Sequence, residues 1–329
     1  MDETPDHEID PETLDAITKV FPEGVYFTFR ACVSGEQANG VVSRVHLIAW
    51  TLREMYPHIS YTGLKRIIFA GDYHQALIDL GKEFNRTFTT TTEPTGMGVA
   101  ITNNVPGGCI VVLEGWVASI LLGSQGEVTD RAIAVVAHEL CHVSDNTHQA
   151  NVFRDVWLQP AAGLGGVFLP GTLALWSEYF ANRYSSSFIR SPQEMTGLLN
   201  GAIGSVEADI SDAVHKYRTN HDLDKVLNIF QGKLRFLTQC VGYAAGLLHG
   251  MEISIQERDP VCAATIAGSR LAPHWDPLLA ELAELDRTYK DWNGTALDPL
   301  KRRIQVIAAS YGFHYRVLEN GSLYVDIPR

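Results

Sequence analysis

The pattern of apolar and polar positions divides the chain into a first part of mixed strands and helices and a second part that is almost entirely helical. In the first part, short runs rich in β-branched and aromatic residues predict strands. Apolar residues at spacings of three and four predict the helices between them. The predicted strands are residues 24–33, 64–71, 96–104 and 109–115, and the predicted helices are residues 12–20, 38–56 and 72–84. These elements favour a small mixed sheet ahead of residue 132.

From residue 132 onward, helical spacing dominates almost to the end of the chain. The predicted helices are residues 132–145, 173–187, 192–217, 223–249, 276–292 and 298–311. Gly250 and Gly312 are expected to end two of these helices. Two alternating runs then flank Asn320-Gly321, which is a strong hairpin signal. The sequence therefore predicts an α+β fold with a largely helical second half and a carboxyl-terminal β-hairpin.

Length and composition predict a globular protein with one large domain or two closely packed ones. The 329 residues suffice for a large core, and 46% hydrophobic with 19% charged residues is typical of globular proteins. We divide the chain into a flexible acidic tail (1–11), a core domain (12–190) and a helical region (191–329) packed on the core. The amino terminus has no secretory pattern, so we expect a cytoplasmic protein.

Charge and hydropathy exclude two classes of partner. A net charge of -12 disfavours binding to a phosphate backbone, which needs clustered lysines and arginines. The two most apolar stretches, 158–176 and 234–250, contain glycines together with prolines or polar residues, which favours the core over a membrane. We therefore expect neither nucleic acid nor a membrane as partner.

The strongest chemical signal is the H-E-x-x-H sequence His138-Glu139-Leu140-Cys141-His142, which ends an uncharged helical run. Positions four apart share a helix face, so His138 and His142 can offer two imidazole nitrogens to one ion. Glu139 leaves the helix about 100° from His138, which suits a general base acting on a metal-bound water. The alternative is a core helix with two hydrogen-bonded histidines. The uncharged run before the motif favours the metal site.

A catalytic zinc ion usually keeps three protein ligands, so the two histidines need a partner. The first candidate is Glu178, which shares a helical face with Ala181, Asn182 and Ser185. Such small or polar residues would let this helix lie close to the metal helix. Asn182 could then hold a histidine ring in the second shell of the metal.

The second candidate for the third ligand is His148. It lies ten residues after His138, which is the spacing of the metzincin motif H-E-x-x-H-x-x-G-x-x-H. That motif turns at a glycine, whereas this chain has Asp145 there. The methionine turn of metzincins also has no suitable counterpart. We therefore prefer Glu178 and keep His148 as the alternative.

The sequence HELCH followed by a helix with Glu178-Tyr179-Phe180-Ala181-Asn182 resembles the gluzincin branch of the zinc metallopeptidases. It looks most like the compact cytoplasmic group that includes the IrrE-type peptidases, over about residues 60–190. The resemblance implies a zincin-like fold, one zinc ion per chain and an inserted loop at 158–171. It also implies a peptide or protein substrate extended against an edge strand, for which 96–104 is the candidate. Many gluzincins have Asp where this chain has Asn182.

The resulting hypothesis is hydrolysis of a peptide bond, in which zinc activates a water and Glu139 takes its proton. The developing oxyanion also needs a hydrogen-bond donor. The candidate donors are Tyr179, Tyr184, His215 and His221. The rival hypothesis is a non-catalytic peptidase-like module that recognises a partner protein through its helical half.

Overall fold

The computed structural model describes residues 10–88, 92–93, 96–123, 126–154, 163–189 and 193–327. The chain forms two compact units, the first made of Met1–Thr92 with Gly98–Thr147 and the second of Glu93–Met97 with His148–Arg329. The domain bounds that we place at residues 11 and 190 stay a prediction. Most of the predicted tail lies outside the described residues, and the first helix, α1 (Pro11–Thr18), begins at its last residue.

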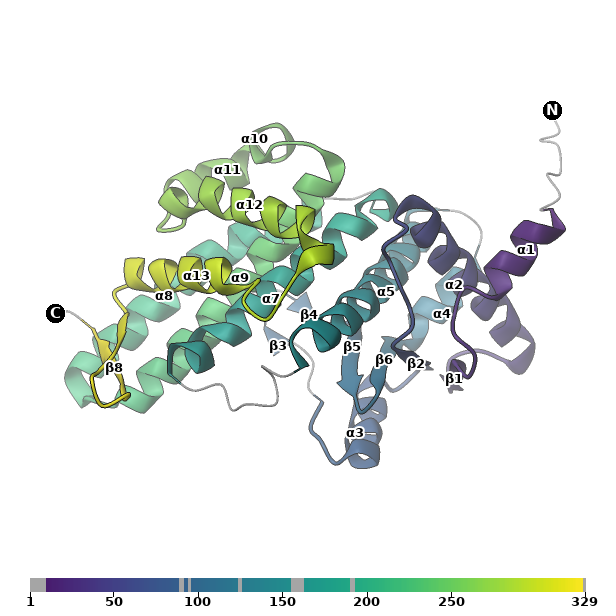
Figure 1. Ribbon diagram of the computed structural model, residues 1–329, viewed down its shortest axis with the longest axis horizontal. Helices are drawn as coiled ribbons and strands as arrows, with labels where there is room; N and C mark the ends of the chain where they lie inside the picture. Colours follow the sequence, from purple (N-terminus) through teal and green to yellow (C-terminus); the bar gives the residue numbers. More distant parts are fainter. Residues whose placement is uncertain are drawn as a thin grey trace. The chain divides into compact units, whose positions relative to one another are not determined.

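A four-stranded mixed sheet forms the centre of the first unit (Figure 1). Its strands, in spatial order, are β1 (Tyr26–Arg30), β2 (Leu64–Ala70), β6 (Gly108–Glu114) and β5 (Ala100–Val105). The pairs β1–β2 and β2–β6 are parallel, whereas β5 pairs antiparallel with β6. This confirms the small mixed sheet and makes β5 an edge strand among the described residues. Two short strands, β3 (Thr92–Glu93) and β4 (Gly96–Met97), form a separate two-stranded sheet.

The central strands of the sheet are buried on both faces. Ile68 and Val112 belong to a core cluster with Leu77 and Leu80 of α3 (Tyr73–Phe84). The alternate residues Ile67 and Phe69 are also buried, which fits a parallel sheet covered on each side. The remaining helices of this unit are α2 (Gly35–Met55), α4 (Gly115–Leu121) and the greater part of α5 (Glu127–Val152).

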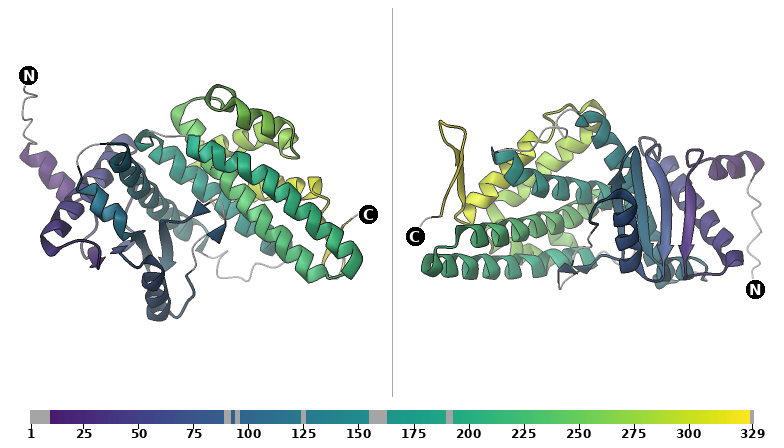
Figure 2. Two further views of the ribbon diagram at one scale, coloured as in Figure 1. Left: turned by 180° about the vertical axis from the view of Figure 1, so that it is seen from behind. Right: turned by 90° about the horizontal axis from the view of Figure 1, so that it is seen from below.

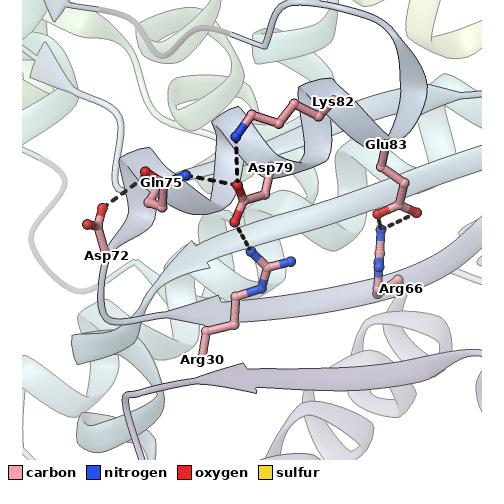
Figure 3. A network of polar contacts seen from close by, with 7 residues as sticks. All are labelled: Arg30, Arg66, Asp72, Gln75, Asp79, Lys82 and Glu83. Carbon is pink, nitrogen blue, oxygen red and sulfur yellow. Dashed lines mark hydrogen bonds and ion pairs between the residues drawn. The ribbon is translucent and has the colours of Figure 1, made fainter.

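Two ion pairs fix α3 on the sheet (Figure 3). Arg30 of β1 donates to Asp79 at 3.1 Å, and Arg66 of β2 donates to both oxygens of Glu83 at 2.9 and 2.7 Å. The Arg66 side chain is only 10% exposed, so water screens this pair less than an exposed pair. At the start of the helix, Asp72 accepts the backbone N–H of Gln75 as an N-cap. The position of α3 is therefore held by charge as well as by its apolar face.

Helix α5 carries the H-E-x-x-H sequence and is longer than the predicted range 132–145. Its buried side chains include Ala132, Val136, Leu140 and Val143, which recur at spacings of three and four. The helix passes through Asp145, which is fully buried, and ends only at Val152. The turn that a metzincin motif requires at Asp145 is therefore not formed.

The second unit is largely helical and ends in a hairpin, as predicted (Figure 2). Its helices are α7 (Gly163–Ser185), α8 (Gln193–Asn220), α9 (Leu223–Met251), α10 (Ile255–Arg258), α11 (Pro260–Ala267), α12 (Ala272–Arg287) and α13 (Asp298–Ser310). Short 3-10 turns, η1 (Ser186–Phe188) and η2 (Tyr289–Asp291), follow α7 and α12. The strands β7 (His314–Val317) and β8 (Leu323–Asp326) pair antiparallel. Helices α10 and α11 were not predicted.

Helices α7 and α9 pack closely because α9 presents three glycines at spacings of four. A Cβ atom on Gly242 would lie 2.5 Å from the carbonyl oxygen of Leu175, and Gly246 and Gly250 face α7 in the same way. The prediction that Gly250 ends α9 is wrong. The helix continues to Met251 and is capped by Glu252 with a φ of 56°, because Gly250 is needed for close contact with Arg183 and Ser186.

The prediction of an inserted loop at 158–171 is wrong for residues 163–171, the part of this range that the structure describes. Residues 155–162 lie outside the described residues, but α7 already begins at Gly163 and includes Pro170. Phe168 is 2% exposed and its ring packs edge-on against Tyr315 of the hairpin. This packing offsets the low helix propensity of glycine and proline. Among the described residues, no helix combines the length and apolar character that crossing a membrane requires.

Candidate metal centre

The two histidines of α5 point toward each other. Their Nε2 atoms lie 2.9 Å apart, and their rings meet edge to face with centroids 4.5 Å apart. Both side chains are half-buried. Two nitrogens bound to one tetrahedral zinc at about 2.05 Å would be about 3.3 Å apart. The observed separation is within a few tenths of an ångström of this value, so the pair fits one zinc ion.

Glu139 of the same helix is buried, with 6% exposure. The hydroxyl of Thr102, on the edge strand β5, donates to its Oε2 at 2.7 Å and lies 3.1 Å from its backbone carbonyl oxygen. The carboxylate is thereby held by one oxygen at the edge of the sheet. This contact could not be predicted from the sequence, because Thr102 occupies an ordinary position in a strand.

A second hydroxyl of the first unit lies in the electrostatic field of Glu139. Tyr73 begins α3, is 8% exposed, and its hydroxyl has no hydrogen-bond partner among the described residues. Burial raises the pKa of Tyr73 far above its usual range, and the charges of Glu139 and Glu114 raise the pKa further. Tyr73 is therefore a neutral phenol at any ordinary pH.

Glu178 lies on α7 in the second unit, where α9 supplies its neighbours. Gln239 donates from Nε2 to Glu178 Oε1 at 2.9 Å and to the Tyr243 hydroxyl at 3.0 Å. Burial raises the pKa of Tyr243 well above its usual value, and the charge of Glu178 raises it further. Tyr243 therefore stays a protonated phenol near Glu178, joined to it through Gln239. Neither Gln239 nor Tyr243 was predicted.

His138, His142 and Glu178 form a group that could hold a metal ion. Each offers one ligand atom, and these atoms all lie within 4.8 Å of one another. Two imidazoles and one carboxylate are a donor set found at catalytic zinc sites, with a fourth position left for water. The residues therefore fit zinc in number and chemistry, and the predicted metal-binding group is confirmed to this extent.

His148 does not belong to this group. Because α5 is continuous, a residue ten positions on lies about 80° round the helix from His138. The His148 ring instead packs 4.0 Å from the Tyr289 ring and 5.7 Å from the Trp292 ring, between centroids. Burial lowers the pKa of His148, which is typical of a neutral core histidine.

Asn182 has a different partner from the one predicted. Its Nδ2 donates to the backbone carbonyl of Glu178 at 3.1 Å, and its Oδ1 has no hydrogen-bond partner among the described residues. A Cβ atom on Gly246 would lie 3.0 Å from the Asn182 Cβ, so this side of α7 faces α9. No described contact places Asn182 behind a histidine ring.

The predicted oxyanion donors have other described contacts or are exposed. The Tyr179 hydroxyl pairs with His249 Nδ1 at 2.9 Å, and the Tyr184 hydroxyl donates to Asp286 at 2.7 Å. His215 lies on α8 and His221 in the turn before α9, and both are exposed. Tyr243 is the tyrosine that the described contacts place at Glu178.

The described residues thus provide two facing imidazoles, a carboxylate within reach of the same ion, and a buried glutamate directly after the first imidazole. This arrangement is compatible with an H-E-x-x-H metal site. Comparison with protein families, with curated proteins and with solved structures finds no match for this chain.

Proposed function

We propose that this protein is a zinc-dependent metallopeptidase that hydrolyses peptide bonds with Glu139 as general base. The observation that carries the proposal is the grouping of His138, His142 and Glu178, whose ligand atoms lie within 4.8 Å of one another. Structural zinc sites are usually closed by four protein ligands, whereas three ligands with an open position are typical of catalysis. The position of Glu139, next to the first ligand, supports the same reading.

A bound zinc ion would supply a Lewis acid that polarises the scissile carbonyl and makes water acidic near neutral pH. The protein would supply the proton transfer. Thr102 engages Glu139 at Oε2, which leaves Oε1 to take a proton from the water and deliver it to the leaving amine. Burial of Glu139 keeps this transfer away from bulk solvent.

The substrate would be an extended peptide beside β5. This strand is at the edge of the sheet and offers backbone groups for pairing. Its residue Thr102 is the one that contacts Glu139, so the strand that would bind the substrate also holds the base. The expected position of the substrate therefore brings a peptide bond near Glu139.

Replacing Thr102 with Val should lower kcat about 10- to 100-fold, since a hydrogen bond to a charged group contributes about 1.5–3 kcal/mol. The hydroxyl positions the carboxylate but touches neither metal nor substrate, so zinc content and KM should change little. Steady-state kinetics on a cleaved peptide would measure the two constants separately. Thr102→Ser keeps the donor and should retain most of the activity. An unchanged kcat in Thr102→Val would remove Thr102 from this role.

A peptide-library digest tests the proposed function directly. The full chain loaded with zinc should cleave a subset of the peptides, which mass spectrometry identifies by their new termini. Chelation should stop cleavage, and added zinc should restore it. If the zinc-loaded chain leaves a broad library intact, the non-catalytic module that recognises a partner protein becomes the better hypothesis.

A further inference from the structure

We propose that Gln239 and Tyr243 of α9 are positioning residues that hold Glu178 in the orientation needed to bind the metal. The inference rests on the metal centre of the proposed function, but not on peptide hydrolysis. A glutamate side chain has several rotatable bonds, and a ligand that is already oriented loses less conformational entropy when the ion binds. Contacts that fix the carboxylate therefore increase metal affinity.

Hydrogen bonds from Gln239 join the three side chains. One Gln239 amide nitrogen, which carries two hydrogens, donates to Glu178 Oε1 at 2.9 Å and to the Tyr243 hydroxyl oxygen at 3.0 Å. The Tyr243 hydroxyl, by accepting this bond, fixes the orientation of the Gln239 amide. One donor from α9 thus reaches the carboxylate directly, and the tyrosine holds that donor in place.

The backbone of α9 can approach Glu178 because Gly242 has no side chain. A Cβ atom at Gly242 would lie 3.0 Å from the Glu178 Cβ. Gln239 and Tyr243 are four residues apart and share a helix face. Gly242 is next to Tyr243, so one of the close contacts between α7 and α9 lies where α9 supplies the two polar side chains.

Gln239 and Tyr243 are better suited than a lysine or arginine to hold a carboxylate that binds a metal. Gln239 is a half-buried amide between the buried residues Thr238 and Cys240, a position that is costly for a polar group without partners. Its bonds to Glu178 and Tyr243 offset that cost. Gln and Tyr are neutral, so they orient the carboxylate and leave its negative charge to attract a cation. A lysine or arginine there would neutralise it.

Zinc affinity, measured by chelator competition on the full chain, tests this inference without relying on activity. Gln239→Met keeps the length of the side chain and removes its donor, so affinity should fall about 10- to 100-fold. Tyr243→Phe should weaken binding in the same direction. The double variant should lose less than the sum of the two single changes in free energy, because the residues act as one set.

Two matched controls separate this role from general effects on the fold. Gln231→Met makes the same change on an exposed part of α9, and Tyr311→Phe removes a buried hydroxyl outside α9. Both should bind zinc as the unaltered chain does, and circular dichroism should show all variants folded. If Gln239→Met does not fold, Tyr243→Phe decides the question.

The outcomes distinguish this inference from the proposed function. Unchanged zinc affinity in the folded variants of Gln239 and Tyr243 would overturn the inference even if the chain cleaves peptides. Weakened affinity in a chain that cleaves no peptide would support the inference and contradict the peptidase proposal. An unaltered chain that binds no zinc would overturn both.

Discussion

Replacing Glu139 with Gln is expected to abolish peptide hydrolysis while the zinc ion stays bound. Gln has nearly the same shape, and its carbonyl oxygen can accept the hydrogen bond that Thr102 now donates at 2.7 Å. It cannot take a proton from water at ordinary pH. General acid–base catalysis contributes about 10²- to 10⁴-fold, so kcat/KM should fall by that factor. Peptide cleavage assays together with metal analysis of the same samples measure both properties.

The matched control for this variant is Glu54→Gln, which makes the same substitution on the exposed surface of α2. It should leave cleavage unchanged. If Glu139→Gln retained the activity of the unaltered chain, Glu139 would not be the base, even if the metal were present. Loss of zinc in Glu139→Gln would instead mean that the carboxylate contributes to metal binding.

Replacing Glu178 with Ala is expected to remove zinc from the purified protein. Two imidazoles would remain, and a site with two protein ligands lacks the third that catalytic zinc sites have. The loss of zinc affinity should exceed the roughly 10- to 100-fold cost of losing a residue that only hydrogen-bonds to a ligand. Inductively coupled plasma mass spectrometry of dialysed protein gives the zinc content, and chelator competition gives the affinity.

His148→Phe tests the alternative ligand in parallel. Phenylalanine keeps an aromatic ring against Tyr289, where the histidine ring now packs at 4.0 Å between centroids. We expect this variant to bind zinc as the unaltered chain does. Full zinc content in Glu178→Ala together with zinc loss in His148→Phe would replace Glu178 by His148 as the third ligand.

The pairing of His138 and His142 could be predicted because it depends only on helix geometry. Residues four apart lie on one face of any α-helix, and the apolar run before them indicated that this helix is buried. The length of α5 could not be predicted in the same way. Asp145 has a low helix propensity, and the predicted helix ended there, yet it is fully buried within a continuous helix that runs to Val152.

The face of α7 that carries Glu178 and Asn182 was recognised, but its neighbour was not. Small residues on a helix indicate that another helix packs closely, and they do not say which one. In the structure, Gly242 and Gly246 of α9 lie against this part of α7. Gln239, which hydrogen-bonds to the Glu178 carboxylate, therefore comes from α9, and Asn182 contributes a bond to the Glu178 backbone.

Tertiary packing also determined the local structure at two places where the residue types predicted a different one. Pro170 and the glycines before it predicted a loop, but burial of Phe168 and Thr172 stabilises a helix there. Gly250 resembled a helix cap, but it serves close contact between helices, and Glu252 adopts the left-handed conformation instead. In both cases packing against residues distant in the sequence stabilised the observed conformation over the one that local propensity favours.

By itself the sequence determined the order of the long helices and of the sheet strands, the terminal hairpin and the facing pair of imidazoles, because each depends on residues within a few positions of one another. Only the tertiary structure decided which residues hold the carboxylates of Glu139 and Glu178. Thr102 reaches Glu139 across 37 positions and Gln239 reaches Glu178 across 61. Single polar residues at such separations leave no periodic pattern, so their pairing arises only when the packed helices and sheet bring them together.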